Sequence, residues 1–315
     1  MPNPLTIPMS HSHLYFDKAI APALTVQSGE HVVLETEDAN MGFIAKESDL
    51  YADFGDLLAM AGGCNPVTGP IHVEGAKPGD SLAVDIIDIK PALWKGEGYT
   101  ALYSNLGALQ HRKTGLEKPM EPRTKICRIE DGFVHFRTHA DARTIRIPLS
   151  PFIGTIGVAP KEERIASAKT GPDFCGNVDI PAVGTGSTVI LPVNVEGALL
   201  SLGDVHACQG DGEITACALE VQAAVEVRVR VVRPPEGIFH TLPRLHDERS
   251  IGVIVPLNHA DYSEAMRMGY TELVRIMAAE YGFDELDAYQ LLNLVGEMRL
   301  GSELSCLCRI ERKYL

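Results

Sequence analysis

The sequence predicts a mainly β fold, in which a β-sandwich or jelly-roll-like body carries α+β insertions and ends in a helical pair. Three observations support this fold class. An apolar run, a short turn and a second β-prone run recur along the first two thirds of the chain. Residues 223–231 alternate in the manner of a half-buried strand. The 29 glycines and 20 prolines supply the many turns that such a body needs.

The recurring run–turn–run pattern occupies residues 24–36, 71–89 and 189–204. The four-residue string Val-Glu-Gly-Ala occurs in it twice, at 73–76 and at 195–198. This repetition is too short and too unevenly spaced for a solenoid. It indicates two related β-layers, as in a sandwich or a jelly roll.

The longest predicted strand lies within residues 219–233. From Ala223 onward, the valines at 225, 227, 229 and 231 point to one face, and the charged residues at 226, 228 and 230 point to the other. This alternation predicts that one face is buried and the other is solvated.

Helix is predicted only near the C-terminus, in a segment of about 261–299. Asp261 begins a capping box, and an apolar stripe continues to Tyr281, after which Gly282 can end the helix. Asp284 then begins a second helix, expected to run to about Met298. Residues 92–121, rich in glycine, lysine and proline, lack periodicity and predict a long loop that either covers a site or is simply solvated.

The composition indicates a globular protein and excludes some partners. The 315 residues are 45% hydrophobic and 22% charged, with a net charge of −14, so nucleic acid and anionic membrane surfaces are not expected as partners. No apolar run approaches the roughly 20 residues that span a bilayer, and residues 1–8 do not resemble a secretion signal.

The seven scattered cysteines, with no Cys-x-x-Cys pair, favour a reducing cytoplasm over a disulfide framework. Cys306 and Cys308, two apart in an apolar stretch, are interpreted as core residues.

The densest cluster of reactive residue types is His206, Gln209, Asp211 and Glu213, preceded by Asp204. A tight turn at 210–212 would fold His206 and Glu213 toward each other across two short strands. A neutral imidazole can bind a metal or carry a proton, and a nearby carboxylate can act as a base. The same pattern also fits a polar surface hairpin without chemistry.

Residues 201–213 (SLGDVHACQGDGE) resemble the signature of the acetamidase/formamidase family. Further stretches similar to the family's motifs occur in the expected order at 13–17 (HLYFD, with Phe16 in place of tryptophan), 22–38, 65–70 (NPVTGP), 73–80, 176–179 (GNVD), 191–193 and 196–198. The resemblance therefore spans residues of about 10–300.

The chain departs from the family pattern at three positions. The family usually has glycine where Cys175 stands and often histidine where Phe174 stands, and an Asp-x-Arg pattern becomes Glu297-Met-Arg299. The first two changes could reshape the pocket, so the resemblance leaves the exact substrate open.

The resemblance implies a single catalytic domain over residues 1–315 and hydrolysis of a small aliphatic amide, of the formamide or acetamide type, to a carboxylate and ammonia. It also implies a divalent metal, with zinc the leading candidate. A homo-oligomer is expected because β-edges and helices often pair across subunits. The resemblance assigns roles to six residues. Asp38 and His206 are expected to be metal ligands, with His206 also catalytic, and Glu213 is expected to be the general base. Asn177 or Gln209 is expected to hold the substrate amide or its oxyanion, and Asp179 is expected to orient a ligand.

Structural interpretations compete with these roles. Asp38 could cap a turn, and Asn177 and Asp179 could bond their own backbone. Asp80 and Asp204 each follow a glycine at the start of a predicted strand and are interpreted as turn residues.

Three functional alternatives also stay open. Cys208 would share a strand face with His206 and could acylate directly, and Cys175 has a similar claim. The bond cleaved could instead belong to a lactam or a carbamate. A non-catalytic small-molecule-binding or metal-binding sandwich would place His206 and Glu213 on an exposed hairpin rather than in a pocket with Asp38.

Overall fold

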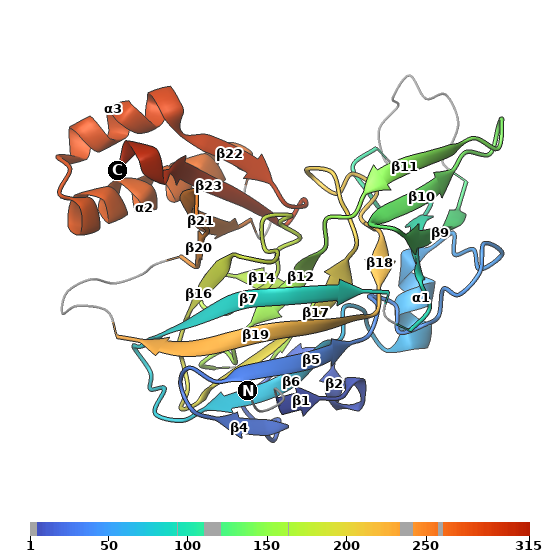
Figure 1. Cartoon of the computed structure of the whole chain (residues 1–315), viewed down its shortest axis with the longest axis horizontal. Coiled ribbons are helices and arrows are strands. Elements are labelled where there is room, and N and C mark those ends of the chain that lie inside the picture. The colour runs from blue at the N-terminus through green and yellow to red at the C-terminus, as the bar shows by residue number, and fades with distance from the viewer. Residues whose placement is uncertain (1–4, 93, 110–120, 163, 234–241, 258–260) are drawn as a thin grey trace.

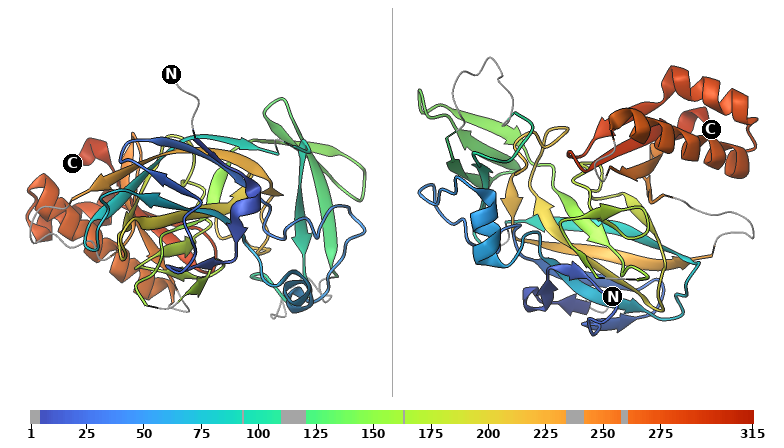
Figure 2. Two further views of the ribbon diagram at one scale, coloured as in Figure 1. Left: turned by 90° about the horizontal axis from the view of Figure 1, so that it is seen from below. Right: turned by 180° about the vertical axis from the view of Figure 1, so that it is seen from behind.

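The computed structural model describes residues 5–92, 94–109, 121–162, 164–233, 242–257 and 261–315. Two large sheets form the body, which confirms the mainly β prediction and the layered arrangement (Figure 1). The C-terminal helical pair extends from one end of this body, and a long β-hairpin arm extends from the other (Figure 2).

The first sheet has nine strands in the described part of the chain. In spatial order they are β1 (Leu5–Ile7), β5 (His31–Thr36), β19 (Ala223–Val232), β7 (Ser81–Pro91), β16 (Thr188–Pro192), β20 (Arg244–His246), β21 (Ser250–Pro256), β23 (Ser305–Glu311) and β22 (Glu297–Leu300).

The second sheet has twelve described strands. Nine follow one path: β11 (Thr144–Pro148), β10 (Phe133–Arg137), β9 (Arg123–Glu130), β8 (Glu97–Leu102), β18 (Glu220–Val221), β17 (Ala198–His206), β12 (Phe152–Gly157), β15 (Cys175–Asn177) and β14 (Thr170–Gly171). The other three are β6 (Val67–Val73), which pairs with β17, and β2 (Ser12–His13) and β4 (Leu24–Val26), which pair with β6. A separate pair joins β3 (Tyr15–Phe16) to β13 (Ile165–Ala166), and 3-10 turns cover Met9–His11 and Arg312–Tyr314.

The main core lies between the two sheets. Val225, Val227 and Val229 of β19 are fully buried there against residues of the second sheet, including Leu202 and Val205 of β17. The predicted alternation of 223–231 is therefore confirmed, although Val231 is only partly buried at the edge of this core. The burial of these side chains removes apolar surface from water and holds β17 rigidly against the first sheet.

The two Val-Glu-Gly-Ala strings lie side by side. The backbone N–H of Val73 donates to the carbonyl of Gly197, and the N–H of Gly197 donates to the carbonyl of Ala76, both at 2.9 Å. The repeated string therefore marks the end of β6 and the start of β17, two neighbouring strands that pair antiparallel within the second sheet.

The C-terminal helical pair is confirmed. In α2 (Tyr262–Tyr281), the Asp261 side chain accepts from the backbone N–H of Glu264, and Gly282 ends the helix at a φ of 74°. The next helix, α3 (Glu285–Val295), ends earlier than the predicted Met298, because the following residues pair with β23 as β22. None of the helices in the described residues combines the length and apolar character needed to cross a bilayer.

Two parts of the sequence prediction need correction. Helix α1 (Phe54–Ala61) was not predicted. Residues 92–121 are not one long loop, because Glu97–Leu102 forms β8 and pairs with β9. Residues 93 and 110–120 of the predicted loop lie outside the described residues.

Helix α2 packs so closely on the first sheet that it contacts the sheet through a glycine. A Cβ atom added at Gly269 would lie 2.5 Å from Sγ of Cys308 and 3.0 Å from a methyl group of Val255. Cys306 and Cys308 are fully buried under this helix, which confirms their prediction as core residues.

We expect Gly269→Ala to destabilise the protein by about 1–2 kcal/mol, because overpacking against Cys308 outweighs the roughly 1 kcal/mol of helix propensity that alanine gains. Urea denaturation measures the difference. Thr271→Ala, at an exposed position of the same helix, should be neutral or slightly stabilising. A Gly269→Ala variant as stable as the parent would show that α2 can move away from the sheet without cost.

Candidate active site

The candidate site is the wall of a cavity of about 220 Å³ at one end of the sandwich. Its lining residues come from sequence positions as distant as Ala39 and Leu304. They include His206 and Glu213, together with Asn177 and Asp179. His206 and Glu213 therefore face a pocket and are not part of an exposed hairpin.

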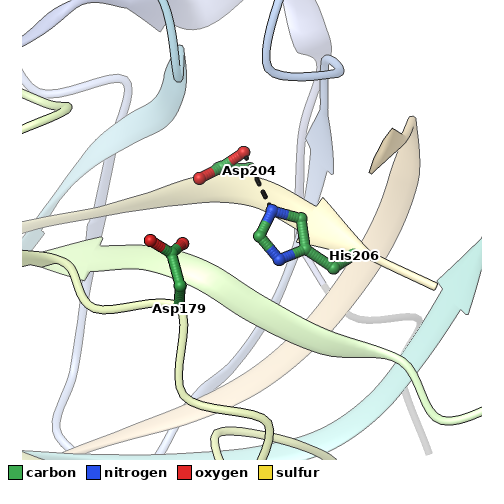
Figure 3. Close-up of side chains that lie close together, drawn as sticks. All are labelled: Asp179, Asp204 and His206. Carbon is green, nitrogen blue, oxygen red and sulfur yellow. Dashed lines mark ion pairs between the residues drawn. The ribbon is translucent and has the colours of Figure 1, made fainter. Parts of the chain in front are cut away.

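Strand β17 places two of the polar side chains. Asp204 and His206 lie two residues apart on a strand and so share a face (Figure 3). The ring of His206 packs edge-on against Phe152 of the neighbouring strand β12, with ring centroids 5.0 Å apart. The interpretation of Asp204 as a turn residue at a strand start is wrong, because it lies inside β17 and is 1% exposed.

Four carboxylates gather around the imidazole of His206. Its Nε2 atom lies 3.3 Å from Oδ1 of Asp204 and 3.2 Å from Oε2 of Glu220, the first residue of β18. Potential ligand atoms of Asp179, Asp204 and His206 lie within 4.8 Å of one another, and so do those of His206, Glu213 and Glu220.

Gln209 fixes the orientation of this imidazole. Its Nε2 amide group donates to the carbonyls of Asp179 at 2.8 Å and Gly301 at 2.9 Å, so its Oε1 must face Nδ1 of His206, 3.1 Å away. Because Oε1 can only accept, Nδ1 carries the proton. The Nε2 atom faces the carboxylates. It therefore either carries a free lone pair, in a neutral imidazole, or is the second N–H of an imidazolium.

The carboxylate oxygens around Nε2 are poorly satisfied by the protein itself. Oδ1 of Asp179, Oδ1 of Asp204 and Oε2 of Glu220 are buried and make no hydrogen bond within the described residues. Buried acceptors without donors are costly. Oxygen atoms of this kind beside an imidazole form the donor set that a divalent cation such as zinc accepts, so these residues fit a metal ion.

The charges at the site explain the shifted pKa values. Burial, reinforced by Asp204, raises the pKa of Asp179 to about 8. Burial and the neighbouring Asp179 raise the pKa of Glu213 well above its usual range. Burial alone would lower the pKa of His206, but Glu220 and Asp204 outweigh it and raise that pKa well above its usual range. The protein without a cation therefore holds protons that a bound cation would displace.

An amide network supports the acidic residues from behind. Nδ2 of Asn65 donates to Oδ2 of Asp204 at 2.7 Å and to Oδ1 of Asn177 at 3.0 Å. Nδ2 of Asn177 donates in turn to Oδ2 of Asp179 at 3.0 Å. The hydroxyl of Thr155 lies within 3.0 Å of both Asn177 and Asp204. Asn177 thus lines the cavity, but much of its bonding capacity is committed to the protein, as is that of Gln209.

The backbone around the site has two features that allow this arrangement. A Cβ atom at Gly154 would lie 2.9 Å from carboxylate oxygens of both Asp179 and Asp204, so the site needs a glycine there. Asp179, Asp204 and Glu213 themselves have φ values of 47°, 54° and 41°, in the left-handed region that non-glycine residues rarely adopt. Strained backbone of this kind is concentrated at functional sites.

The turn at 210–212 brings His206 and Glu213 together, as predicted. Oε1 of Glu213 accepts from the backbone N–H of Ala218 at 3.1 Å, which anchors the half-buried carboxylate. The predicted second strand is wrong, because residues 207–219 form a loop and the chain re-enters the sheet only at β18. Asp211, also in this turn, is exposed and pairs with Arg299 at 2.6 Å.

Asp38 lies apart from the His206 cluster. It is buried, and its carboxylate accepts from the backbone N–H groups of Asn40 and Gly42 and from the hydroxyl of Tyr99 at 3.2 Å. It belongs to neither of the two candidate metal clusters among the described residues. It lines a neighbouring cavity of only about 30 Å³, which also touches Glu220.

Glu220, Asn65 and Thr155 were not predicted from the sequence to be site residues. A detectable signal existed for Glu220, which is the single charged residue in the apolar run 216–221 (ACALEV) and is 3% exposed. A carboxylate in such a run needs a partner when it is buried. Asn65 lies in a stretch that resembles the family, but nothing in that stretch assigns a contact to its amide.

The cysteines near the site are poorly suited to act as nucleophiles. Burial raises the pKa of Cys64 to about 12 and also raises the pKa of Cys208 and Cys217. Each therefore stays a thiol at neutral pH, whereas the thiolate is the reactive form.

The two departures at 174 and 175 lie outside the lining of the cavity. Phe174 packs against Phe16, with ring centroids 5.6 Å apart, and Cys175 is fully buried. Cys175 has a φ of 79°, which explains why the family's usual residue at this position is glycine. These changes alter packing behind the site rather than its surface.

Together, the sandwich and the carboxylate–histidine cavity define a β protein with a buried acidic cavity that can accept a cation. The chain belongs to the acetamidase/formamidase family, whose model matches residues 8–174 and 164–302.

Named relatives agree with this assignment. The solved structure of an acetamidase from Bacillus halodurans is 31% identical, with a TM-score of 0.85 and 98% of each chain covered. The acetamidase of Mycolicibacterium smegmatis is 29% identical over 68% of this chain and 64% of its own length. A putative formamidase of Schizosaccharomyces pombe is 27% identical over 67% of this chain and 62% of its own length. The chain therefore spans less than two thirds of these two curated relatives.

Asp38 should make the stability of the metal-free protein depend on pH. Burial raises its pKa to about 6 in the folded protein, compared with about 3.9 in an unfolded chain. The stability that protonated Asp38 contributes is fully present below about pH 4 and is lost as the pH rises through 6. We expect Asp38→Asn to remove about 2–3 kcal/mol of the decrease in unfolding free energy between pH 4 and pH 7.

Urea denaturation with a chelator present measures this change at the two pH values. Only the difference between the two pH values is compared, so a uniform loss of stability in the variant has no effect. Asp53→Asn, at an exposed helix cap, is the matched control and should keep the pH dependence of the parent. Equal pH dependence in Asp38→Asn and the parent would contradict the raised pKa.

Proposed function

We propose that this protein is an amidohydrolase that cleaves a small aliphatic primary amide, of the formamide or acetamide type, to a carboxylate and ammonia. The observation that carries the proposal is the group of buried carboxylates around Nε2 of His206 in the wall of a small cavity. Acetamidases and formamidases are the named relatives of the chain.

The chemistry of an amide explains why such a site is useful. Resonance makes the amide carbonyl a poor electrophile, so the enzyme must strengthen the nucleophile and stabilise the developing oxyanion. The cavity of about 220 Å³ accommodates a small substrate with its water, since a water molecule takes up about 30 Å³ in the liquid.

We propose that Asp179, Asp204 and His206 hold a divalent cation, with zinc the leading candidate. A bound cation would polarise the amide carbonyl and lower the pKa of a water toward about 7. Gln209 acts as a positioning residue, because its contact with Nδ1 leaves Nε2 as the ligating atom of His206. Asp38, expected from the sequence to be a ligand, is instead proposed to support the wall next to Glu220 through Tyr99.

Glu213 is proposed to move the protons. Its carboxylate takes a proton from the attacking water as the new C–O bond forms, and it returns that proton to the amide nitrogen as the C–N bond breaks. The contact of Oε1 with the N–H of Ala218 anchors the carboxylate during both transfers. Asn177 lines the same cavity and is proposed to orient the substrate amide.

Two alternatives have less support. A non-catalytic role in binding a small neutral molecule does not explain why unsatisfied carboxylate oxygens converge on Nε2 of His206. A thiol mechanism conflicts with the raised pKa values of Cys64 and Cys208. Carbamates are tested in the same ammonia-release assay as the simple amides. Lactams are tested by the appearance of the amino acid that ring opening forms, because ring opening releases no ammonia.

Ammonia release from formamide and acetamide should disappear when metal is stripped and return when zinc is restored. Isothermal titration of the stripped protein should give one zinc site per chain. Asp204→Asn should weaken zinc binding at least tenfold, because it removes a buried anionic ligand. Asp211→Asn, in the loop that follows β17 and paired with Arg299 on the surface, should bind zinc as the parent does. Full turnover by stripped protein in the presence of chelator would contradict the metal proposal.

Glu213→Gln should lower kcat for acetamide by about 10²–10⁴-fold, the usual contribution of a general base. Zinc binding should change much less, because Glu213 is proposed to act on water rather than as one of the three ligands. Glu303→Gln changes an exposed carboxylate of the same cavity and should retain nearly full activity. If Glu213→Gln turned over normally, the proton-transfer role would have to move to Glu220 or another group.

A further inference from the structure

Part of the cavity wall is apolar and belongs to a hydrophobic cluster of its own. Residues of the 44–57 segment pack there against β8 and the residues that follow it, apart from the main core between the sheets. Phe54, Tyr103 and Leu106 of this cluster line the same cavity as His206. The cavity thus joins the acidic site to an apolar wall.

Phe54 is the first residue of α1, and its ring is held firmly. The ring packs on Tyr103 with centroids 4.8 Å apart at 59°. The backbone N–H of Phe54 donates to Oδ1 of Asn105 at 3.0 Å, and the N–H of Ser104 donates to the carbonyl of Ala52 at 2.8 Å. The two hydrogen bonds fix the backbone at the start of α1 beside the residues that follow β8, and packing on Tyr103 holds the ring.

Tyr103 is fixed as well. Its hydroxyl accepts from Nδ2 of Asn40 at 3.2 Å, and its side chain is 2% exposed. A wall of two packed aromatic rings is a rigid boundary, and rigid walls discriminate between ligands by size.

We propose that Phe54, backed by Tyr103, limits the length of the acyl group that the enzyme accepts. This inference rests on the proposed amidase function and names the substrate class more closely: primary amides with a short, uncharged acyl chain. The amide group is held at the acidic side of the cavity, and the acyl chain extends toward the aromatic wall.

The charge of the cavity excludes anionic acyl groups. Five carboxylates line it, and none of its described lining residues is a lysine or arginine. With the amide group at the acidic side, a carboxylate on the acyl chain would lie toward the aromatic wall, where no described lining residue is a lysine or arginine, and it would be repelled by the carboxylates of the cavity. Succinamate, which replaces the terminal methyl group of butyramide with a carboxylate, is therefore expected to be a poor substrate even when the wall is opened.

The test is kcat/KM for formamide, acetamide, propionamide, butyramide and succinamate with zinc-loaded enzyme. In the parent, activity should fall beyond the shortest amides. In Phe54→Ala, the ratio of kcat/KM for butyramide to that for acetamide should rise about tenfold or more, the discrimination that a hydrophobic pocket gives per methylene. The ratio for succinamate should not rise. Each ratio is taken within one variant, so the fraction of folded enzyme cancels.

Two further variants keep the test decisive. Phe54→Leu retains an apolar side chain at the start of α1 and should shift the ratio in the same direction by less. Phe43→Ala removes a partly exposed aromatic side chain from the same part of the chain, outside the cavity lining, and should leave the ratio unchanged.

The possible failures are distinguishable. Parent enzyme that hydrolyses acetamide, with the same chain-length profile in Phe54→Ala and Phe54→Leu, would overturn the role of Phe54 and leave the amidase proposal intact. Folded, zinc-loaded parent that hydrolyses none of these amides would overturn the amidase proposal and this inference with it.

Discussion

The structure around the site depends on one constraint, the burial of more negative groups than a single imidazole can neutralise. Asp179, Asp204 and Glu220 are each at most 3% exposed, and His206 is the cationic group beside them. An unpaired buried carboxylate is strongly unfavourable, so the site must take up protons or a cation. Both responses place a movable positive charge beside Nε2 of His206 in the wall of the cavity.

The sandwich holds the acidic residues in place although their backbone is strained. Left-handed backbone at a non-glycine residue costs on the order of 1–3 kcal/mol and persists only where the surroundings hold it in place. Asp204 is held by β17, which pairs with β12, β6 and β18 in the second sheet and contacts β5 and β7 of the first. Asp179 and Glu213, outside regular strands, are held instead by Gln209, Asn177 and the N–H of Ala218.

The fold was largely predictable because it depends on periodic signals. The alternation after Ala223 and the cap at Asp261 depend on residues within a few positions of one another, and both are confirmed. The end of α3 was not predictable, because pairing of residues 297–300 with β23 overrides local helical preference. Helix α1 was missed because a short helix with three alanine or glycine residues among eight gives only a weak apolar stripe.

The site was predictable only where its residues lie close in sequence. His206 and Glu213 were found together because a single turn joins them, whereas Asp179 reaches them by a long-range contact that only the family resemblance implied. The assignment of Asp38 as a ligand illustrates the limit, because the sequence places it at the end of a strand without showing which way the carboxylate faces. Asp204 was dismissed because Gly-Asp usually marks a turn, and no local signal indicated that the chain continues as a strand.

The cavity also has a consequence for the order in which the protein becomes functional during its synthesis. Its lining begins at Ala39 and includes Ser302 and Leu304, which follow β22 and are positioned when β23 pairs with β21. Most of the sandwich can assemble as the chain leaves the ribosome, since N-terminal parts emerge first. The cavity closes only when β22 and β23 arrive, so a nascent chain carries its acidic side chains before they are enclosed.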